Sequence, residues 1–165
     1  MERFKKAVNK TRNFEGGYIN HPSDYGGETK YGISKKSYPN IDIKNLTIDE
    51  AELIYKKEYW DSIKLDSIIN QEIAEELFDT AVNMGCRRAI SFLQRSLNAL
   101  GITPELIVDS IIGNKTINAT NSYKYPKVLI KALNGFQISY YILRVESDPT
   151  QKVFFRGWIM NRVNF

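Results

Sequence analysis

The feature that most constrains the fold is a succession of segments in which apolar residues recur every three or four positions. Phe4, Val8 and Thr11 show this spacing near the N-terminus, and it returns from residue 47 onward. Such spacing places the apolar side chains on one face of an α-helix. The glycine-rich stretch 16–33 interrupts it, with short aromatic and aliphatic pieces that favour a small β-hairpin with a wide loop. The sequence therefore predicts a mainly α fold, of the α+β kind, with one small hairpin.

Capping residues mark where the helices begin and end. The first helix is expected to run to about Phe14, because Gly16 and Gly17 readily adopt the left-handed conformation found past helix ends. Thr47 and Glu50 have the spacing of a capping box and open a helix that runs to about Trp60. Further helices are expected over residues 70–84, 90–100, 114–120 and 126–143, and from residue 148 onward, with Tyr31-Gly32-Ile33 as the returning strand of the hairpin.

The length of the chain favours one compact unit. With 165 residues, it is long enough for one core and too short for two ordinary domains. The sequence contains no linker rich in Gly, Ser or Pro and no internal repeat. We expect a principal region over residues 1–101, with a segment over residues 102–165 packed on it.

Charge and cysteine content restrict the partners and the chemistry. The net charge is +4, and both ends of the chain are basic, so nucleic acid, an anionic membrane surface and bacterial cell wall are all open as partners. Cys86 is the only cysteine, which excludes an internal disulfide and a cysteine-based zinc site.

The start of the chain, MERFKKAVNK, has positive charge but no apolar core, so we do not expect a secretory signal. No stretch approaches the roughly 18 apolar residues of a membrane span, so we expect no membrane insertion. We therefore expect synthesis in the cytoplasm, with any external target reached by another export route.

Two carboxylates near the hairpin suggest glycosidase chemistry. Glu15 is expected in the last turn of the first helix, where the helix dipole and the neighbours Phe14 and Tyr18 would raise its pKa and suit it to act as an acid. Asp24 lies in a polar glycine-flanked loop that the hairpin would fold back over Glu15. Glycosidases need such a pair, one carboxyl protonated and the other ionised. Taken alone, a glutamate at a helix end beside two glycines is usually an ordinary exposed residue.

Several motifs together resemble the family 108 glycoside hydrolases, bacterial and phage N-acetylmuramidases of the lysozyme-like superfamily. The resemblance runs from EGGY at Glu15, through DYGG at Asp24 and TKYGI at Thr29, to FDTAVNMG at Phe78. It continues through Leu93-Gln94, residues 108–113 with Thr116, Gly157-Trp158 and Arg162-Val163.

This resemblance implies a lysozyme-like helical fold with the hairpin beside a catalytic glutamate, Glu15. It implies cleavage of the β-1,4 bond between N-acetylmuramic acid and N-acetylglucosamine, with no cofactor, and a peptidoglycan-binding segment over residues 102–165. Phage endolysins of the same superfamily have a related Glu-Asp-Thr spacing. Here eight residues separate Glu15 from Asp24 and four separate Asp24 from Thr29, one fewer than in those endolysins. Asp24 and Thr29 are thus catalytic candidates inferred from spacing.

Four further residues are expected to bind substrate: Tyr18, Tyr31, Asp79 and Asn83. Asp79 and Asn83 lie four apart on one helical face, where they either line the cleft or form a buried polar pair. Tyr31, Tyr55, Tyr59 and Trp60 either stack on sugar rings or belong to the core. His21 and Cys86 are expected to have no metal-binding or nucleophilic role.

Two other functions remain compatible with these motifs. A lytic transglycosylase would close the sugar's own 6-hydroxyl on the anomeric carbon, and a catalytically silent wall-binding or virion module would keep the fold alone. We expect a monomer that binds bacterial peptidoglycan and no nucleic acid. Release through a holin or a secretion apparatus would bring it to the wall, whether as a phage endolysin, a virion component or a bacterial secretion factor.

Overall fold

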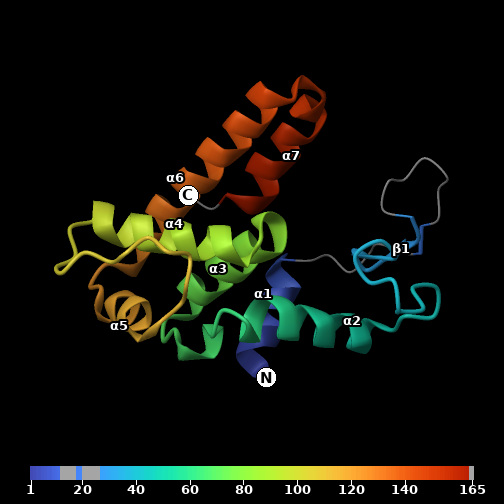
Figure 1. Ribbon diagram of the computed structural model, residues 1–165, viewed down its shortest axis with the longest axis horizontal. Helices are drawn as coiled ribbons and strands as arrows, with labels where there is room; N and C mark the ends of the chain where they lie inside the picture. The colour runs from blue at the N-terminus through green and yellow to red at the C-terminus, as the bar shows by residue number, and fades with distance from the viewer. Residues whose placement is uncertain (12–17, 20–26, 164–165) are drawn as a thin grey trace.

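A body of packed helices, with one long helical pair projecting from it, makes up the computed structural model (Figure 1). The structure describes residues 1–11, 18–19 and 27–163. The α-helices are α1 (Glu2–Thr11), α2 (Ile48–Tyr55), α3 (Gln71–Met84), α4 (Cys86–Ala99), α5 (Asn114–Ser122), α6 (Pro126–Ser147) and α7 (Lys152–Arg162). The shorter elements are the strands β1 (Thr29–Lys30) and β2 (Ile33–Ser34), the π-helix η1 (Lys56–Asp61) and the 3₁₀ turns η2 (Leu65–Ser67) and η3 (Pro149–Gln151). This confirms the mainly α, lysozyme-like fold predicted from the sequence.

Helix α3 lies at the centre of the body and packs against α1, α4 and α6. Its apolar face, with Ile73, Leu77 and Ala81 buried, meets the apolar face of α1. Phe4, Trp60 and Phe78 meet edge to face, with ring centroids 5.7–5.9 Å apart. Edge-to-face contacts favour one arrangement of the rings beyond the area that they bury. This aromatic cluster joins α1, η1 and α3 into one core.

The predicted capping box at the start of α2 is present. The Thr47 hydroxyl accepts a hydrogen bond from the Glu50 backbone N–H, and Glu50 Oε2 accepts one from the Thr47 backbone N–H at 2.8 Å. The helix continues past Tyr55 as the π-helix η1 and carries Trp60 into the core. The helical path thus reaches the predicted end, but its hydrogen bonding changes at Lys56.

The hairpin forms, although its turn lies elsewhere than the sequence suggested. Tyr31 and Gly32, expected in the returning strand, form the turn between β1 and β2, and their φ angles are 50° and 72°. Two-residue hairpin turns of type I′ require positive φ at both central residues, which glycine adopts without strain. The returning strand therefore begins at Ile33. Ile19 also pairs with Thr29 in an isolated antiparallel bridge.

Gln94, in α4, organises the loop that leads to α5. Its buried amide donates to the Asp109 carboxylate at 2.8 Å and to the Ile111 carbonyl at 3.1 Å, and its carbonyl accepts from the Ser110 backbone at 3.0 Å. A buried polar group needs such partners, since leaving it unpaired costs free energy. Gln94 therefore fixes this loop to α4, together with Asn98, whose amide exchanges two hydrogen bonds with the Leu106 backbone.

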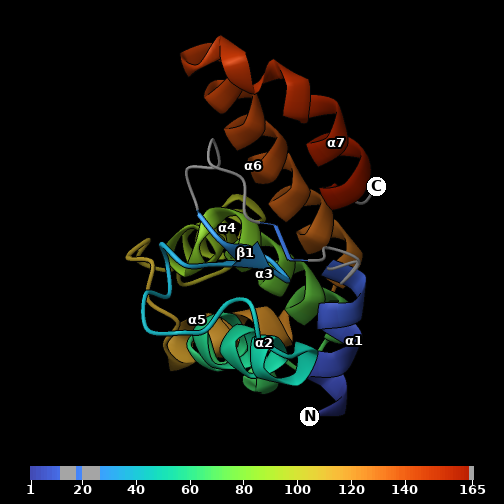
Figure 2. The ribbon, with the colours of Figure 1, turned by 90° about the vertical axis from the view of Figure 1, so that its right-hand side faces the viewer.

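Helices α6 and α7 form an antiparallel pair that stands out from the body, while the hairpin lies at another corner (Figures 1 and 2). Stacking of Tyr141 on Trp158, with centroids 5.0 Å apart, joins the two helices. Helix α7 runs back toward the body and ends at Arg162, next to the buried Val163. In the described ranges, no helix has the length and apolar character needed to cross a bilayer.

Candidate active site

A polar cleft of about 580 Å³ lies where α1 ends. The hairpin turn, η1, α3 and α7 all contribute to its walls. Its volume is within the range typical of ligand sites. The lining includes Thr11, Tyr31, Tyr59, Asn83, Asn161 and Arg162.

Three tyrosines form one wall of this cleft. Tyr55 and Tyr59 stack with ring centroids 5.6 Å apart, and the Tyr55 hydroxyl donates to the Tyr31 carbonyl at 3.3 Å. This hydrogen bond ties the hairpin turn to the helical body. Of the four aromatic candidates, Trp60 belongs to the core, whereas the three tyrosines reach the cleft. Tyr55 is itself largely buried, so it belongs to the core as well as to the cleft lining.

The sequence left open whether Asp79 and Asn83 line the cleft or form a buried polar pair, and the structure gives a different role to each. Asn83 lines the cleft, and its amide donates to the Asp79 carboxylate at 3.0 Å. Asp79 lies behind it and pairs with Arg162, whose Nη1 is 2.8 Å from Oδ1. Burial raises the pKa of Asp79, and Arg162, the Thr11 hydroxyl and Asn83 partly oppose that shift. Asp79 therefore supports the cleft wall from behind.

Helix α7 contributes two cleft residues that the sequence reasoning did not single out, Asn161 and Arg162. Arg162 also donates to the Thr11 carbonyl at 2.7 Å. Periodicity gives no sign of this contact, because 151 positions separate the two residues. The only signal was that Arg162-Val163 belongs to the family-like motifs.

Two predicted site residues on the hairpin do not line this cleft. The Tyr18 hydroxyl donates to Glu28 Oε1 at 2.7 Å, and the ring is partly exposed. The Thr29 hydroxyl donates to the Gly27 carbonyl at 3.2 Å. Their roles stay predictions. Glu15, Asp24 and His21 lie outside the described residues.

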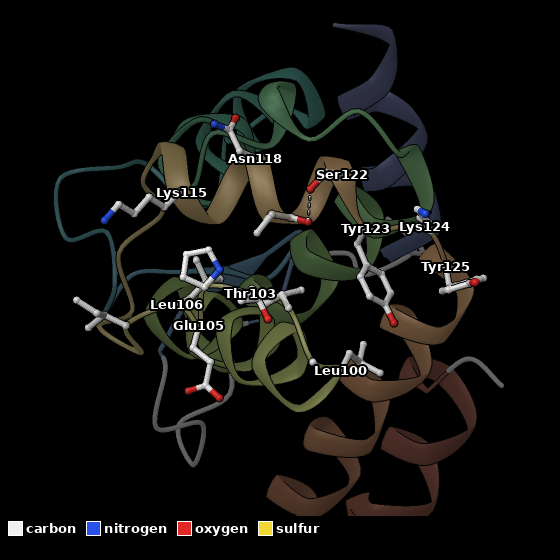
Figure 3. A pocket seen from close by; sticks show the side chains of 15 residues that line it. Leu100, Thr103, Glu105, Leu106, Lys115, Asn118, Ser122, Tyr123, Lys124 and Tyr125 are labelled. Atoms are coloured by element: carbon white, nitrogen blue, oxygen red, sulfur yellow. Dashed lines mark hydrogen bonds between the residues drawn. The ribbon is translucent and has the colours of Figure 1, made fainter.

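A second cavity, of about 710 Å³, lies between the segment after α4 and the outer side of α5 (Figure 3). Leu100, Ile102 and Leu106 give it an apolar lining, while Lys115 and Tyr125 lie on opposite sides of it. Tyr123 and Tyr125 meet edge to face, with centroids 6.1 Å apart. Helix α5 and the hairpin lie at opposite ends of the long axis (Figure 1), so this cavity is separate from the polar cleft.

Metal binding receives no support from the described part of the chain, in which no three His, Cys, Asp or Glu residues are grouped to hold an ion. Cys86 is a free cysteine whose thiol donates to the Glu58 carbonyl at 3.3 Å.

Comparison with known proteins gives matches along almost the whole chain. Residues 8–85 match the family described as Glycosyl hydrolase 108, and residues 88–163 match the Predicted Peptidoglycan domain. No curated protein sequence matches significantly. The structure is similar to that of SagA from Brucella abortus, with 26% identity, a TM-score of 0.71, and coverage of 95% of this chain and 87% of that one. Residues 8–85 therefore belong to the glycosyl hydrolase 108 family and residues 88–163 to the predicted peptidoglycan domain, which together make the chain a glycoside hydrolase that acts on peptidoglycan.

Proposed function

We propose that this chain is an N-acetylmuramidase, a lysozyme, that hydrolyses the β-1,4 bond between N-acetylmuramic acid and N-acetylglucosamine with Glu15 as general acid. The position of the polar cleft at the end of α1 carries this proposal. Glu15 follows Thr11 by four residues, and an extended chain of that length spans at most about 14 Å. Covalent geometry therefore keeps Glu15 within reach of a cleft that Thr11 lines.

Asp24 is the proposed partner of Glu15. It precedes Gly27 by three residues and is thus tied to the hairpin whose turn lines the cleft. In the proposed reaction, the Glu15 carboxyl gives its proton to the glycosidic oxygen as the bond to the muramic acid C1 breaks. Water attacks that carbon and gives its proton to Asp24. Asp24 then releases its proton to solvent and Glu15 regains one, which restores both carboxyl groups.

The described cleft residues suit the chemistry of the substrate. Tyrosine rings bind the C–H faces of sugars, and the Asn83 and Asn161 amides can pair with acetamido groups. Lys10, whose side chain is 52% exposed, lines the cleft beside Glu75, whereas Arg162 is paired with Asp79. Such convergent polar groups are typical of specific binding sites.

The test is Glu15→Gln, with Glu146→Gln on α6 as a matched control outside the cleft. The amide has nearly the same shape but carries no acidic proton, so wall hydrolysis should fall about 100- to 10,000-fold while the fold is kept. Glu146→Gln should retain wild-type activity. Retention of more than a tenth of the activity by Glu15→Gln would exclude Glu15 as the acid.

Product analysis separates the proposal from its alternatives. Hydrolysis leaves reducing muramic acid, whereas a lytic transglycosylase leaves the anhydro form, and mass spectrometry distinguishes the two. Wild-type protein that binds wall but releases no fragments would indicate a silent wall-binding or virion module instead.

We also propose that residues 102–165 help to bind the wall, with the second cavity as one contact. Its apolar lining, its tyrosines and Lys115 and Lys124 would accommodate a sugar or a stem peptide that bears a carboxylate. Tyr125→Ala should weaken retention on insoluble wall and leave hydrolysis of short soluble fragments unchanged. Phe154→Ala, which removes an exposed aromatic ring from α7, is the control. Equal retention of both variants would remove the cavity from wall binding.

The route to the wall is a further proposal. We infer release through a holin or another export system after synthesis in the cytoplasm, because the peptidoglycan that the chain is proposed to cleave lies outside the cytoplasmic membrane. Fractionation of cells that express the chain with and without a co-expressed holin tests this route.

A further inference from the structure

We propose that Arg162, on α7, is a positioning residue for hydrolysis in the polar cleft: it joins the end of α1 to the cleft wall on α3. This inference rests on the proposed function of the cleft. A single nitrogen, Nη1, donates to the Thr11 carbonyl at 2.7 Å and to Asp79 Oδ1 at 2.8 Å. Three helices from distant parts of the sequence therefore meet at one guanidinium.

The first contact fixes the end of α1. The last carbonyls of a helix have no partner within the helix, and a cation there also interacts favourably with the helix dipole. Arg162 supplies both a donor and a charge at Thr11, the last described residue of α1. Because Glu15 follows four residues later, the direction in which the chain leaves Thr11 determines where the acid can lie.

The second contact fixes the cleft wall on α3. The Asp79 carboxylate accepts hydrogen bonds from Arg162, from the Thr11 side chain and from the Asn83 amide. Its side chain is only 14% exposed, so the ion pair lies in a partly desolvated setting where breaking it costs more than at the surface. Arg162 thus holds Asp79, and Asp79 holds Asn83 at the cleft.

These contacts assign a catalytic contribution to the segment that matches the Predicted Peptidoglycan domain. Asn161 and Arg162 form part of the cleft wall, although they lie in the range 88–163 rather than in the hydrolase match. The last turn of α7 therefore belongs to the catalytic unit. Misplacement of a catalytic group by about 1 Å can cost about 100-fold in rate, so support of this kind has measurable consequences.

The experiment compares Arg162→Gln and Arg162→Lys with Arg156→Gln, which removes an exposed charge from the same helix away from the cleft lining. We expect Arg162→Gln to lower kcat about 10- to 100-fold with KM within about twofold of wild type. Arg162→Lys keeps the charge and one donor group, so its kcat should lie in between. Arg156→Gln should match wild type.

Two further measurements separate positioning from a merely structural role. Loss of the Arg162 charge should favour the protonated form of Glu15 and move the alkaline limb of the kcat profile to higher pH, whereas Arg162→Lys should not shift it. Amide exchange in the last turn of α1 should speed up in Arg162→Gln. If the kcat of Arg162→Gln falls only in proportion to the fraction of the variant that is unfolded, and its pH profile does not shift, the proposal is overturned.

Failure of this inference can be told apart from failure of the proposed function. If wild-type protein releases reducing muramic acid and Arg162→Gln does so at the same kcat, only the positioning role is wrong. If wild-type protein releases none, the proposed function is wrong. Equal amide exchange of α1 in wild type and Arg162→Gln would then also show that Arg162 does not hold the end of α1.

Discussion

Gln94 and Asp109 are joined by a 2.8 Å hydrogen bond that attaches the loop before α5 to α4. Donation from Gln94, and from the Ile111 backbone N–H, lowers the pKa of Asp109 below its usual value. The carboxylate is thus better stabilised in the folded than in the unfolded chain. Both residues belong to motifs by which the sequence resembled its family, and the structure gives those motifs a physical role.

Asp109→Asn should lower the midpoint of thermal unfolding at pH 7. Between the folded and unfolded pKa values, the unfolded chain binds more protons, so this contribution to stability increases with pH. It is present above the unfolded value of about 3.9 and is lost as pH falls through the lower folded value. Unfolding midpoints of both proteins from pH 7 to pH 2 should therefore converge. A constant difference would show that the charge of Asp109 is not involved.

Gln137→Leu should destabilise the contact between α6 and α3. The buried Gln137 amide donates to Glu76 Oε1 and to the Thr80 hydroxyl, each at 2.5 Å. Removal of the amide leaves buried groups on Glu76 and Thr80 without this partner, which costs about 1–3 kcal/mol. Urea unfolding measures this loss. The double variant with Glu76→Gln should be less destabilised than the sum of the single variants, and strict additivity would argue against direct coupling.

Asp24→Asn should reduce hydrolysis strongly, but less than Glu15→Gln does. The amide can still orient a water molecule, although it loses basicity and charge. We expect the separation of an inverting enzyme, about 6.5–9.5 Å between the two carboxyl groups, because a glycine-flanked loop suits a site for water. NMR of the first product formed reports its anomeric configuration. Full activity of Asp24→Asn would leave Glu15 working with Thr29 or with the substrate's own groups.

Chelators should leave hydrolysis unchanged, whereas added salt should weaken binding to the wall. The reason is the basic character of both chain ends, whose attraction to an anionic polymer is screened over about 8 Å at physiological ionic strength. Sedimentation with purified wall across a salt series measures the binding. Activity lost in EDTA and restored by zinc or calcium would contradict a metal-free mechanism.

Local signals in the sequence predicted most of the helices. Thr47 and Glu50 form the predicted capping box, Asn70 caps α3, and Pro126 opens α6. Each of these signals depends on residues within one turn of a helix, which a pattern in the sequence can show. Sequence reasoning therefore performs best where the physical cause is short in range.

The details of the cleft depend on contacts that no local pattern contains. Tyr31 was expected in a strand, but its position in the turn follows from the pairing of Lys30 with Ile33. Asp79 and Asn83 were correctly placed on one helical face, yet which of them reaches the cleft depends on Arg162. The boundary predicted at residues 101 and 102 stays a prediction, as do the roles of Glu15, Asp24, Thr29 and Tyr18.

The contact between Thr11 and Arg162 also bears on how the protein matures during translation. A nascent chain grows from its N-terminus, and domains generally fold as units in that order. The helices of the hydrolase match are complete many residues before Arg162 is added. The cleft can therefore gain its α7 wall only late in synthesis, and a ribosome stalled before α7 would carry a helical body without a finished cleft.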